Sequence, residues 1–207
     1  MKYYAVIDTN VLVAFLLTNN RESSVYRVMQ LVKEGTIIPL LHSEIVQEYK
    51  DVLSRDKLKL DKLSVSDIIE AITTIGINCD RKESTESFPD PDDIVFYEVS
   101  LSIDEAYLIT GNLKHFPQNG HVVTPAEMLQ IIHLAESSQG NICEPTTDYM
   151  IDHKRKIIER GWQTIEKIRT DALQNGLYQL TIDNINQIIR DYRQEKNINV
   201  IICKQDE

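Results

Sequence analysis

The sequence is poor in cysteine and in long apolar runs, and each shortage excludes a class of protein. Its three cysteines, Cys79, Cys143 and Cys203, are odd in number and far apart, which suits neither a disulfide framework nor a zinc site. No apolar run is long enough for a signal peptide or for a membrane-spanning helix. We therefore expect a cytoplasmic protein with free thiols and no membrane partner.

Positive charge is also scarce, and it is scarcest in the first two thirds of the chain. Residues 1–140 hold 12 lysines and arginines against 21 aspartates and glutamates, whereas residues 141–207 hold 10 against 11. Affinity for nucleic-acid phosphates usually comes from Lys and Arg, so an acidic protein is not an obvious nucleic-acid binder. The excess acids need another role, and holding Mg²⁺ or Mn²⁺ is such a role.

Short apolar segments alternate with segments of helical spacing over the first 135 residues. The expected strands are 3–7, 36–41, 77–80, 106–109 and 121–123. The expected helices are 11–17, 24–34, 44–54, 64–75, 92–102 and 125–135. This alternation predicts an α/β fold, a three-layer sandwich with a mostly parallel central sheet and helices on both faces.

The pattern changes after residue 137, which indicates a linker and a helical extension. We interpret residues 1–137 as one domain, 138–147 as a linker and 148–207 as a helical C-terminal extension. Isoleucines and Trp162 form an apolar stripe over residues 148–174, Asn175-Gly176 breaks the helix, and Thr181 can cap a second helix. Residues 199–203 are apolar enough to suggest a final strand.

Acidic and amide side chains gather at places where a parallel sheet could bring them together. Asp8 and Asn112 each follow an expected strand, and such positions meet at the carboxyl edge of the sheet. The other candidates lie on a helix or at a helix start: Glu44, Glu48 and Asp51, and Asp90, Asp92 and Asp93. Carboxylate oxygens are the ligands that Mg²⁺ and Mn²⁺ prefer.

Each candidate also has a purely structural interpretation. Asp8 could cap the first helix, Glu48 could belong to a solvated helix face, and acids at 90–93 suit any helix N-terminus. The five histidines show no close pairing that suits zinc, and a structural role is expected for His115. Single residues therefore leave the choice open, and only the ordered set favours a functional site.

That ordered set resembles the PIN-domain family. The motifs are Asp8-Thr9-Asn10-Val11, Glu48-Tyr49, Asp90-Pro91-Asp92-Asp93 and Leu108-Ile109-Thr110-Gly111-Asn112. The resemblance spans about residues 3–133 and is greatest to the toxin components of toxin–antitoxin pairs. It implies a ribonuclease, an endonuclease in our interpretation, that hydrolyses RNA phosphodiester bonds with Mg²⁺ or Mn²⁺.

Carried over by position, the resemblance implies a set of site residues. Asp8, Glu48 and Asp93 would be the catalytic metal ligands, and Asp92 is a neighbour that could exchange roles with Asp93. Asn10 and Thr110 would contact the ligands and hold them in position without binding the metal ion themselves. Asn112 would belong to the same supporting group as Asn10 and Thr110. Many family members have an acid at this position, and the uncharged amide of Asn112 leaves open whether one or two metal ions bind.

The C-terminal segment resembles a different kind of protein. Residues 175–186 are similar to the C-terminal region of antitoxins that partner PIN ribonucleases. We therefore expect either a built-in inhibitor, in which Arg190 or Arg193 pairs with the site carboxylates, or a structural appendage that packs on the domain or a dimer mate. The expected partners are RNA, an antitoxin or the chain's own tail, and a second copy in a homo-oligomer.

Three other functions compete with this one. A phospho-acceptor receiver domain needs an acidic pair near the first strand and a Lys after a late strand, and the chain has neither. A haloacid-type phosphatase needs Asp-x-Asp where this chain has Asp8-Thr9-Asn10. The strongest alternative is a catalytically weakened PIN-fold module that binds proteins, with Asn112 as the sign of decay.

Overall fold

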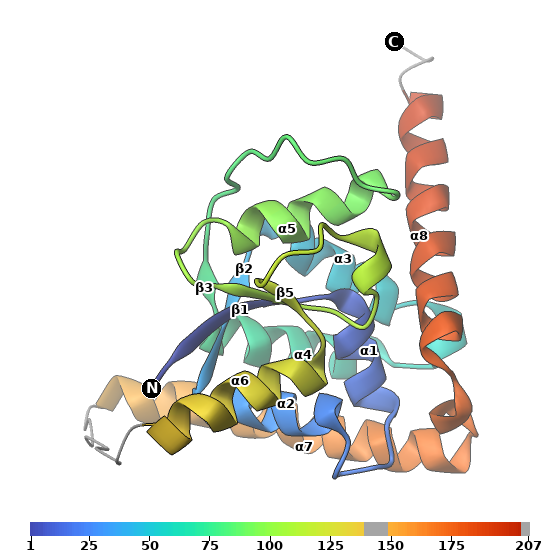
Figure 1. Ribbon diagram of the computed structural model, residues 1–207. Coiled ribbons are helices and arrows are strands. Elements are labelled where there is room, and N and C mark those ends of the chain that lie inside the picture. The colour runs from blue at the N-terminus through green and yellow to red at the C-terminus, as the bar shows by residue number, and fades with distance from the viewer. Residues whose placement is uncertain (139–148, 204–207) are drawn as a thin grey trace.

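Figure 1 shows the computed structural model of the protein, and the description covers residues 1–138 and 149–203. Most of the expected linker, 138–147, lies outside these residues. Over the described part, no helix has both the length and the apolar character needed to cross a membrane.

A five-stranded parallel sheet forms the centre of the molecule, as the sequence predicts. The strands are β1 (Tyr3–Ile7), β2 (Ile37–Leu41), β3 (Ile77–Asn78), β4 (Tyr107–Ile109) and β5 (Val122–Val123), in the spatial order β3-β2-β1-β4-β5. Every pairing is parallel. The central strands are continuously apolar because helices cover both of their faces.

The helices of the sandwich are α1 (Thr9–Leu17), α2 (Ser24–Lys33), α3 (Ser43–Leu53), α4 (Lys62–Ile75), α5 (Ile94–Ser100) and α6 (Pro125–Ser138). α5 contacts β1, β2 and β4, and α2 and α4 pack on β2 from the other side (Figure 1). This confirms the predicted three-layer α/β class.

Helix starts differ slightly from the expected ones because other side chains supply the caps. α3 begins at Ser43, and the His42 side chain, rather than Ser43, accepts from the Glu44 amide. α4 begins at Lys62, since the Asp61 side chain accepts from the backbone amides of Leu63 and Ser64. The expected helix 92–102 is a 3₁₀ turn, Pro91–Asp93, followed by α5.

The C-terminal part consists of two long helices, α7 (Tyr149–Gln174) and α8 (Ile182–Cys203), joined by a short 3₁₀ turn. Gly176 has a φ of 74°, which lets the chain turn between them. The strand expected at 199–203 is wrong, because α8 continues through these residues and extends away from the body of the molecule (Figure 1). Extending a formed helix needs no new nucleation, so its apolar end remains helical.

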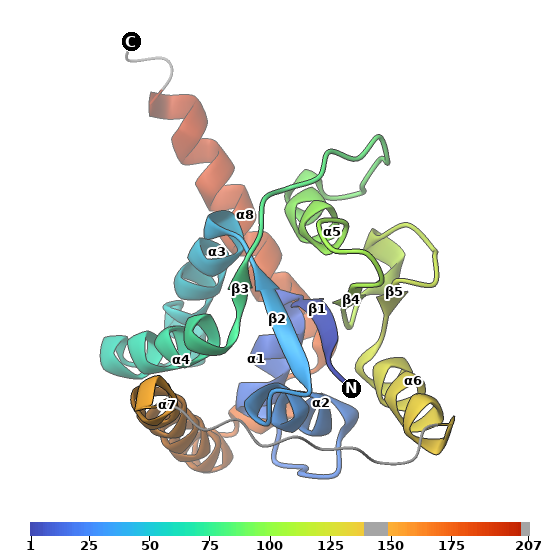
Figure 2. The ribbon, with the colours of Figure 1, turned by 90° about the vertical axis from the view of Figure 1, so that its left-hand side faces the viewer.

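α7 lies along α4, as Figure 2 shows. The predicted apolar stripe is buried there, with Trp162, Ile165 and Ile168 in the same hydrophobic core as the sheet. Arg160 contributes at the edge through ion pairs with Asp67 and Glu70. α8 in turn packs on α1 and α3, so α7 places α8 across the carboxyl end of the sheet.

Close packing of α7 on α4 gives a first testable prediction. A Cβ at Gly161 would lie 2.3 Å from the Ala71 Cβ and 2.9 Å from the Asp67 carbonyl oxygen. Gly161→Ala should therefore destabilise the protein by about 1–2 kcal/mol, since overpacking exceeds the gain in helix propensity. Gly120→Ala, which meets nothing within 4 Å, is the control for denaturant unfolding. Equal stability of the two variants would contradict this packing.

Candidate active site

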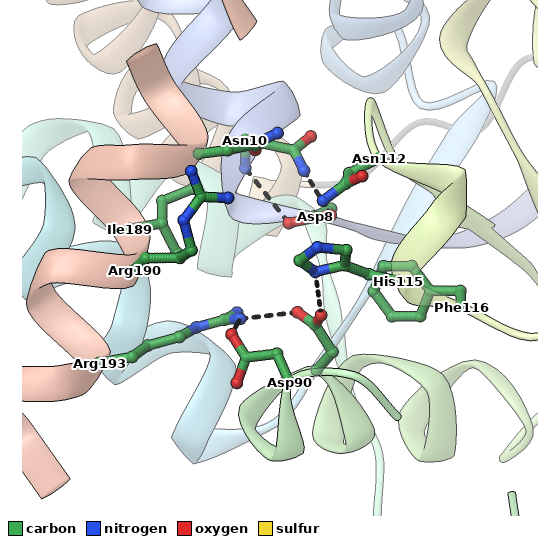
Figure 3. A pocket seen from close by; sticks show the side chains of 11 residues that line it. Asp8, Asn10, Asp90, Asn112, His115, Phe116, Ile189, Arg190 and Arg193 are labelled. Carbon is green, nitrogen blue, oxygen red and sulfur yellow. Dashed lines mark hydrogen bonds and ion pairs between the residues drawn. The ribbon is translucent and has the colours of Figure 1, made fainter. Parts of the chain in front are cut away.

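The candidate site begins at the carboxyl ends of β1 and β4, where Asp8 and Thr110 face each other. Thr110 Oγ1 donates to Asp8 Oδ2 at 2.5 Å, and Asn10 Nδ2 donates to the same oxygen at 2.6 Å. The Asn10 amide donates to Asp8 Oδ1 at 3.2 Å, so Asp8 also caps α1. Asp8 is buried, and its carboxylate accepts from both residues predicted to support it; Figure 3 shows the contact with Asn10.

Glu48 reaches this region from α3, on the other side of β1. Its side chain is buried at 5% exposure, so a solvated helix face does not describe it. Thr9 Oγ1 donates to Glu48 Oε1 at 2.6 Å. The next residue, Tyr49, donates from its hydroxyl to the carbonyl oxygen of Ile7, which ties α3 to the end of β1. This contact fixes where Glu48 enters the site.

Asp93 comes from the 3₁₀ turn before α5 and has two ligand-type neighbours. His115 Nδ1 lies 2.8 Å from Asp93 Oδ2. One ligand atom from each of Asp90, Asp93 and His115 lies within 4.8 Å of the others, which is close enough for one cation. Asp92 is not part of this group, and its Oδ2 accepts from Asn197 Nδ2 at 3.5 Å. The structure thus brings Asp90, rather than Asp92, beside Asp93.

A buried arginine from α8 joins these carboxylates. Arg193 donates from Nε to Glu48 Oε2 at 3.1 Å and from Nη2 to Glu48 Oε1 at 3.0 Å. Its Nη1 lies 2.7 Å from Asp90 Oδ2 and 2.7 Å from Asp93 Oδ1. Arg190 lines the same pocket (Figure 3), but its Nη2 donates to Gln187 Oε1 at 2.8 Å. Of the two arginines considered from the sequence, Arg193 therefore pairs with the acids.

Burial of so much charge changes the ionisation of the site. Burial, followed by the charge of Asp93, raises the pKa of Asp8 to about 6, against the hydrogen bond from Thr110. Burial likewise raises the pKa of Glu48 and of Asp93, although Arg193 acts in the opposite direction on both. Burial alone would lower the pKa of Arg193, but the carboxylates outweigh it and raise the pKa. The acids thus depend on a cation for their charged form.

Little space remains between the ion network and α8 on the Asp8 side, whereas a wider cavity of about 320 Å³ borders Asp90, His115 and Arg193 on the outer side. A cavity of about 20 Å³ lies between the carboxyl end of the sheet and α8. It is lined by Asp8, Asn10, Asp90, Asp93, Asn112, His115, Phe116, Asn186, Ile189, Arg190 and Arg193. That volume holds roughly one water molecule. A nucleotide does not fit into this smaller space while α8 is in place.

Asn112 belongs to the rim of this cavity. Its backbone amide donates to Thr110 Oγ1 at 2.9 Å, and the Gly111 amide donates to Asn10 Oδ1 at 2.9 Å. The first bond closes the turn after β4, and the second joins that turn to the start of α1. The side chain of Asn112 lines the pocket without adding charge.

Three contacts of the site were not assigned from the sequence. Asp90 lies in the same motif as Asp93, and the three-residue spacing across a helical turn is a signal that could have identified it. Thr9 directly follows Asp8, but nothing local indicates that its hydroxyl meets Glu48. His115 follows Asn112 by one 3₁₀ turn, and it contacts Asp93 only because that turn folds back.

The fold and the site define an α/β protein with four carboxylates converging at the carboxyl edge of a parallel sheet. The family model described as "PIN domain" matches residues 4–114, which is more than half of the chain. The chain therefore belongs to the PIN-domain family, whose members are generally metal-dependent nucleases. No curated protein and no solved structure matched it.

Proposed function

We propose that this chain is a metal-dependent ribonuclease, an RNA endonuclease of the toxin type, that is restrained by its own C-terminal helix. The observation that carries the proposal is the contact of Arg193 with Glu48, Asp90 and Asp93. It places a cation from the C-terminal extension, whose residues 175–186 resemble an antitoxin, at the carboxylates of a PIN domain.

The donor set fits a hard divalent cation. Asp8, Glu48 and Asp93 would hold Mg²⁺ or Mn²⁺. Of these, Asp93 is grouped with Asp90 and His115, Asp8 lines the same cavity, and Glu48 shares Arg193 with Asp93. When bound, the ion supplies a coordinated water of lowered pKa and stabilises charge on the attacked phosphate. Thr110 and Asn10 keep the Asp8 carboxylate in one orientation, and Thr9 does the same for Glu48. Because the supports are buried, the ligands are preorganised.

Restraint follows from competition for the same carboxylates. A guanidinium bound to Glu48 through two parallel hydrogen bonds satisfies the charge that would otherwise attract a metal ion. Since Arg193 belongs to the same chain, its effective concentration at the site is high. Activity then requires α8 to leave, either spontaneously or through a partner. That the chain also forms a homo-oligomer stays a prediction.

A catalytically weakened PIN-fold module remains the second candidate. Asn112 favours it, because the position lines the pocket and adds no charge. Such a module would keep the Arg193 contact as a structural ion network and would have no use for a metal ion. Metal-dependent cleavage of RNA by the intact chain, or by a variant with α8 released, separates the two functions.

A circular single-stranded RNA provides the test, because only an endonuclease can open it. The full chain should cleave it slowly, at a rate that rises with Mn²⁺ or Mg²⁺ concentration and falls to the background in EDTA. The metal must displace Arg193, so higher metal concentrations are needed than for the Arg193→Ala variant. Circular RNA that stays intact with both proteins at saturating Mn²⁺ would reject the nuclease and support the binding module.

Substitution is a better way to release the site than removal of the whole tail. Truncation near Gly140 would delete α7 as well as α8 and would expose the face of α4 that Trp162, Ile165 and Ile168 now cover. Loss of that burial would confound activity with stability. A single change at Arg193 leaves both helices in the chain and alters only the contact that the proposal concerns.

A further inference from the structure

α8 presents acidic side chains, as well as Arg193, to the domain. Glu195 accepts from both terminal nitrogens of Arg55, at 2.5 Å from Nη1 and 2.6 Å from Nη2. Asp191 Oδ2 lies 2.8 Å from Lys57 Nζ. Both cations belong to the short connection between α3 and α4: Arg55 directly precedes the 3₁₀ turn Asp56–Leu58, and Lys57 lies within it.

We propose that Arg55 and Lys57 bind backbone phosphates of the RNA, and that Asp191 and Glu195 occupy these positions as phosphate mimics. This inference rests on the proposed function. Arg55 grips its carboxylate with two parallel N–H···O bonds, which is the geometry that a guanidinium also offers to a phosphate. Lys57 provides a point charge for a second phosphate.

The arrangement along α8 matches what a nuclease site needs from its substrate. Asp191 and Glu195 are one helical turn apart, a rise of roughly 6 Å, which is on the scale of neighbouring phosphates in an extended strand. Arg193 lies between them in sequence and points instead at the carboxylates that would hold the metal. α8 therefore pairs its own acidic side chains with basic residues of the domain, and it pairs Arg193 with the acidic residues of the site.

The charge of the domain makes these two cations significant. Residues 1–140 carry 12 basic against 21 acidic residues, so RNA affinity must come from local clusters of positive charge. Two other cations of the domain, Arg21 and Lys33, also pair with the tail, but they contact Glu166 and Glu159 of α7. Those pairs are remote from the cavity and provide matched controls.

A simple latch is the alternative, in which the two ion pairs only help to hold α8 in place. Exposed ion pairs contribute little to such docking. The buried side chains of Ile185, Ile188, Ile189 and Tyr192 already attach α8 to the domain. A latch also has a clear signature, because breaking an ion pair from either side should have the same effect.

The experiment breaks the same ion pairs from opposite sides in the full chain, with Arg193→Ala in every protein so that the docking of α8 is weakened. One variant adds Arg55→Gln and Lys57→Gln, a second adds Asp191→Asn and Glu195→Gln, and the control adds Arg21→Gln and Lys33→Gln. Fluorescence anisotropy gives the Kd for a labelled single-stranded RNA in EDTA over a range of KCl concentrations, and circular dichroism checks that each protein is folded.

The inference predicts effects of opposite sign. The variant at Arg55 and Lys57 should bind RNA roughly tenfold more weakly, and the slope of log Kd against log salt should fall by about 1.4, as expected for two lost phosphate contacts. The variant at Asp191 and Glu195 should bind more tightly, and the control should not change.

The two failures can be told apart. If both pairs of substitutions changed the Kd for RNA equally and in the same direction, the ion pairs would be a latch and the phosphate site would be overturned. The proposed function would stand, because the proteins would still bind RNA. If none of the folded proteins bound RNA, the proposed function would fail and the phosphate site with it.

Discussion

Replacing Arg193 with alanine should raise Mn²⁺-dependent RNA cleavage by the full chain roughly 100-fold or more at limiting metal concentration. Arg193 is buried and bonded to Glu48, Asp90 and Asp93. Removing one partner of a buried ion network costs about 3–5 kcal/mol, and about 1.4 kcal/mol corresponds to a factor of ten. That penalty destabilises the state in which α8 is docked on the domain. When α8 has left, a metal ion can relieve the repulsion among the carboxylates.

Initial rates over a Mn²⁺ titration measure this effect, with Arg190→Ala as the control. Arg190 lies on the same helix and lines the same cavity, but its Nη2 donates to Gln187, so its loss should change the rate little. Arg193→Lys keeps the charge without the two parallel bonds to Glu48 and should give an intermediate rate. If Arg193→Ala and Arg190→Ala cleaved RNA at the same rate as the unmodified chain, α8 would not be an inhibitor.

The double variant Asp8→Asn, Arg193→Ala should cleave RNA at least about 100-fold more slowly than Arg193→Ala alone. Changes to groups that only support a metal ligand already cost about 10–100-fold, and Asp8 is expected to be a ligand itself. The fold should survive, since the amide keeps the shape of the carboxylate.

Asp92→Asn is the matched control for the loss at Asp8. Asp92 lies outside the smaller cavity and contacts Asn197, so its substitution should leave the cleavage rate within a small factor of the parent. Rates measured at saturating Mn²⁺ separate a lost ligand from a weakened metal affinity. Undiminished cleavage by a well-folded protein carrying Asp8→Asn would place the activity elsewhere in the chain.

The sequence is sufficient for the class of fold because its pattern is local. Apolar segments such as residues 3–7 and 37–41 are continuous, as buried parallel strands require, and helical spacing separates them. The end of α8 shows where this reasoning fails. Residues 199–203 read alone resemble a strand, but they follow a helix that has already formed.

The site is less predictable because it is assembled from contacts between distant residues. Strand ends bring Asp8 and Thr110 together, and that meeting follows from topology alone. Glu48 looks like part of a polar helix face, and only the position of α3 against β1 buries it. The choice of Asp90 over Asp92 beside Asp93 depends on how the 3₁₀ turn is rotated, which no spacing rule specifies.

The selection of Arg193 over Arg190 has the same origin. Both residues lie on the helix after Thr181, and both are long enough to reach an acidic pocket. The apolar side chains of Ile185, Ile188, Ile189 and Tyr192 orient α8 on the domain, and that orientation points Arg193 at Glu48. A helix pattern gives the apolar face, but it does not give the rotation of that face over a particular partner.

The most direct test of the account is anomalous X-ray diffraction from Mn²⁺-soaked crystals of the unmodified chain and of the Arg193→Ala variant. We expect a manganese peak in the variant within coordination distance of Asp8 and Asp93, and no peak there in the unmodified chain, whose Arg193 remains bonded to Glu48. A manganese ion beside an unmoved Arg193, or none among these carboxylates in the variant, would contradict the claim that Arg193 takes the place of the metal.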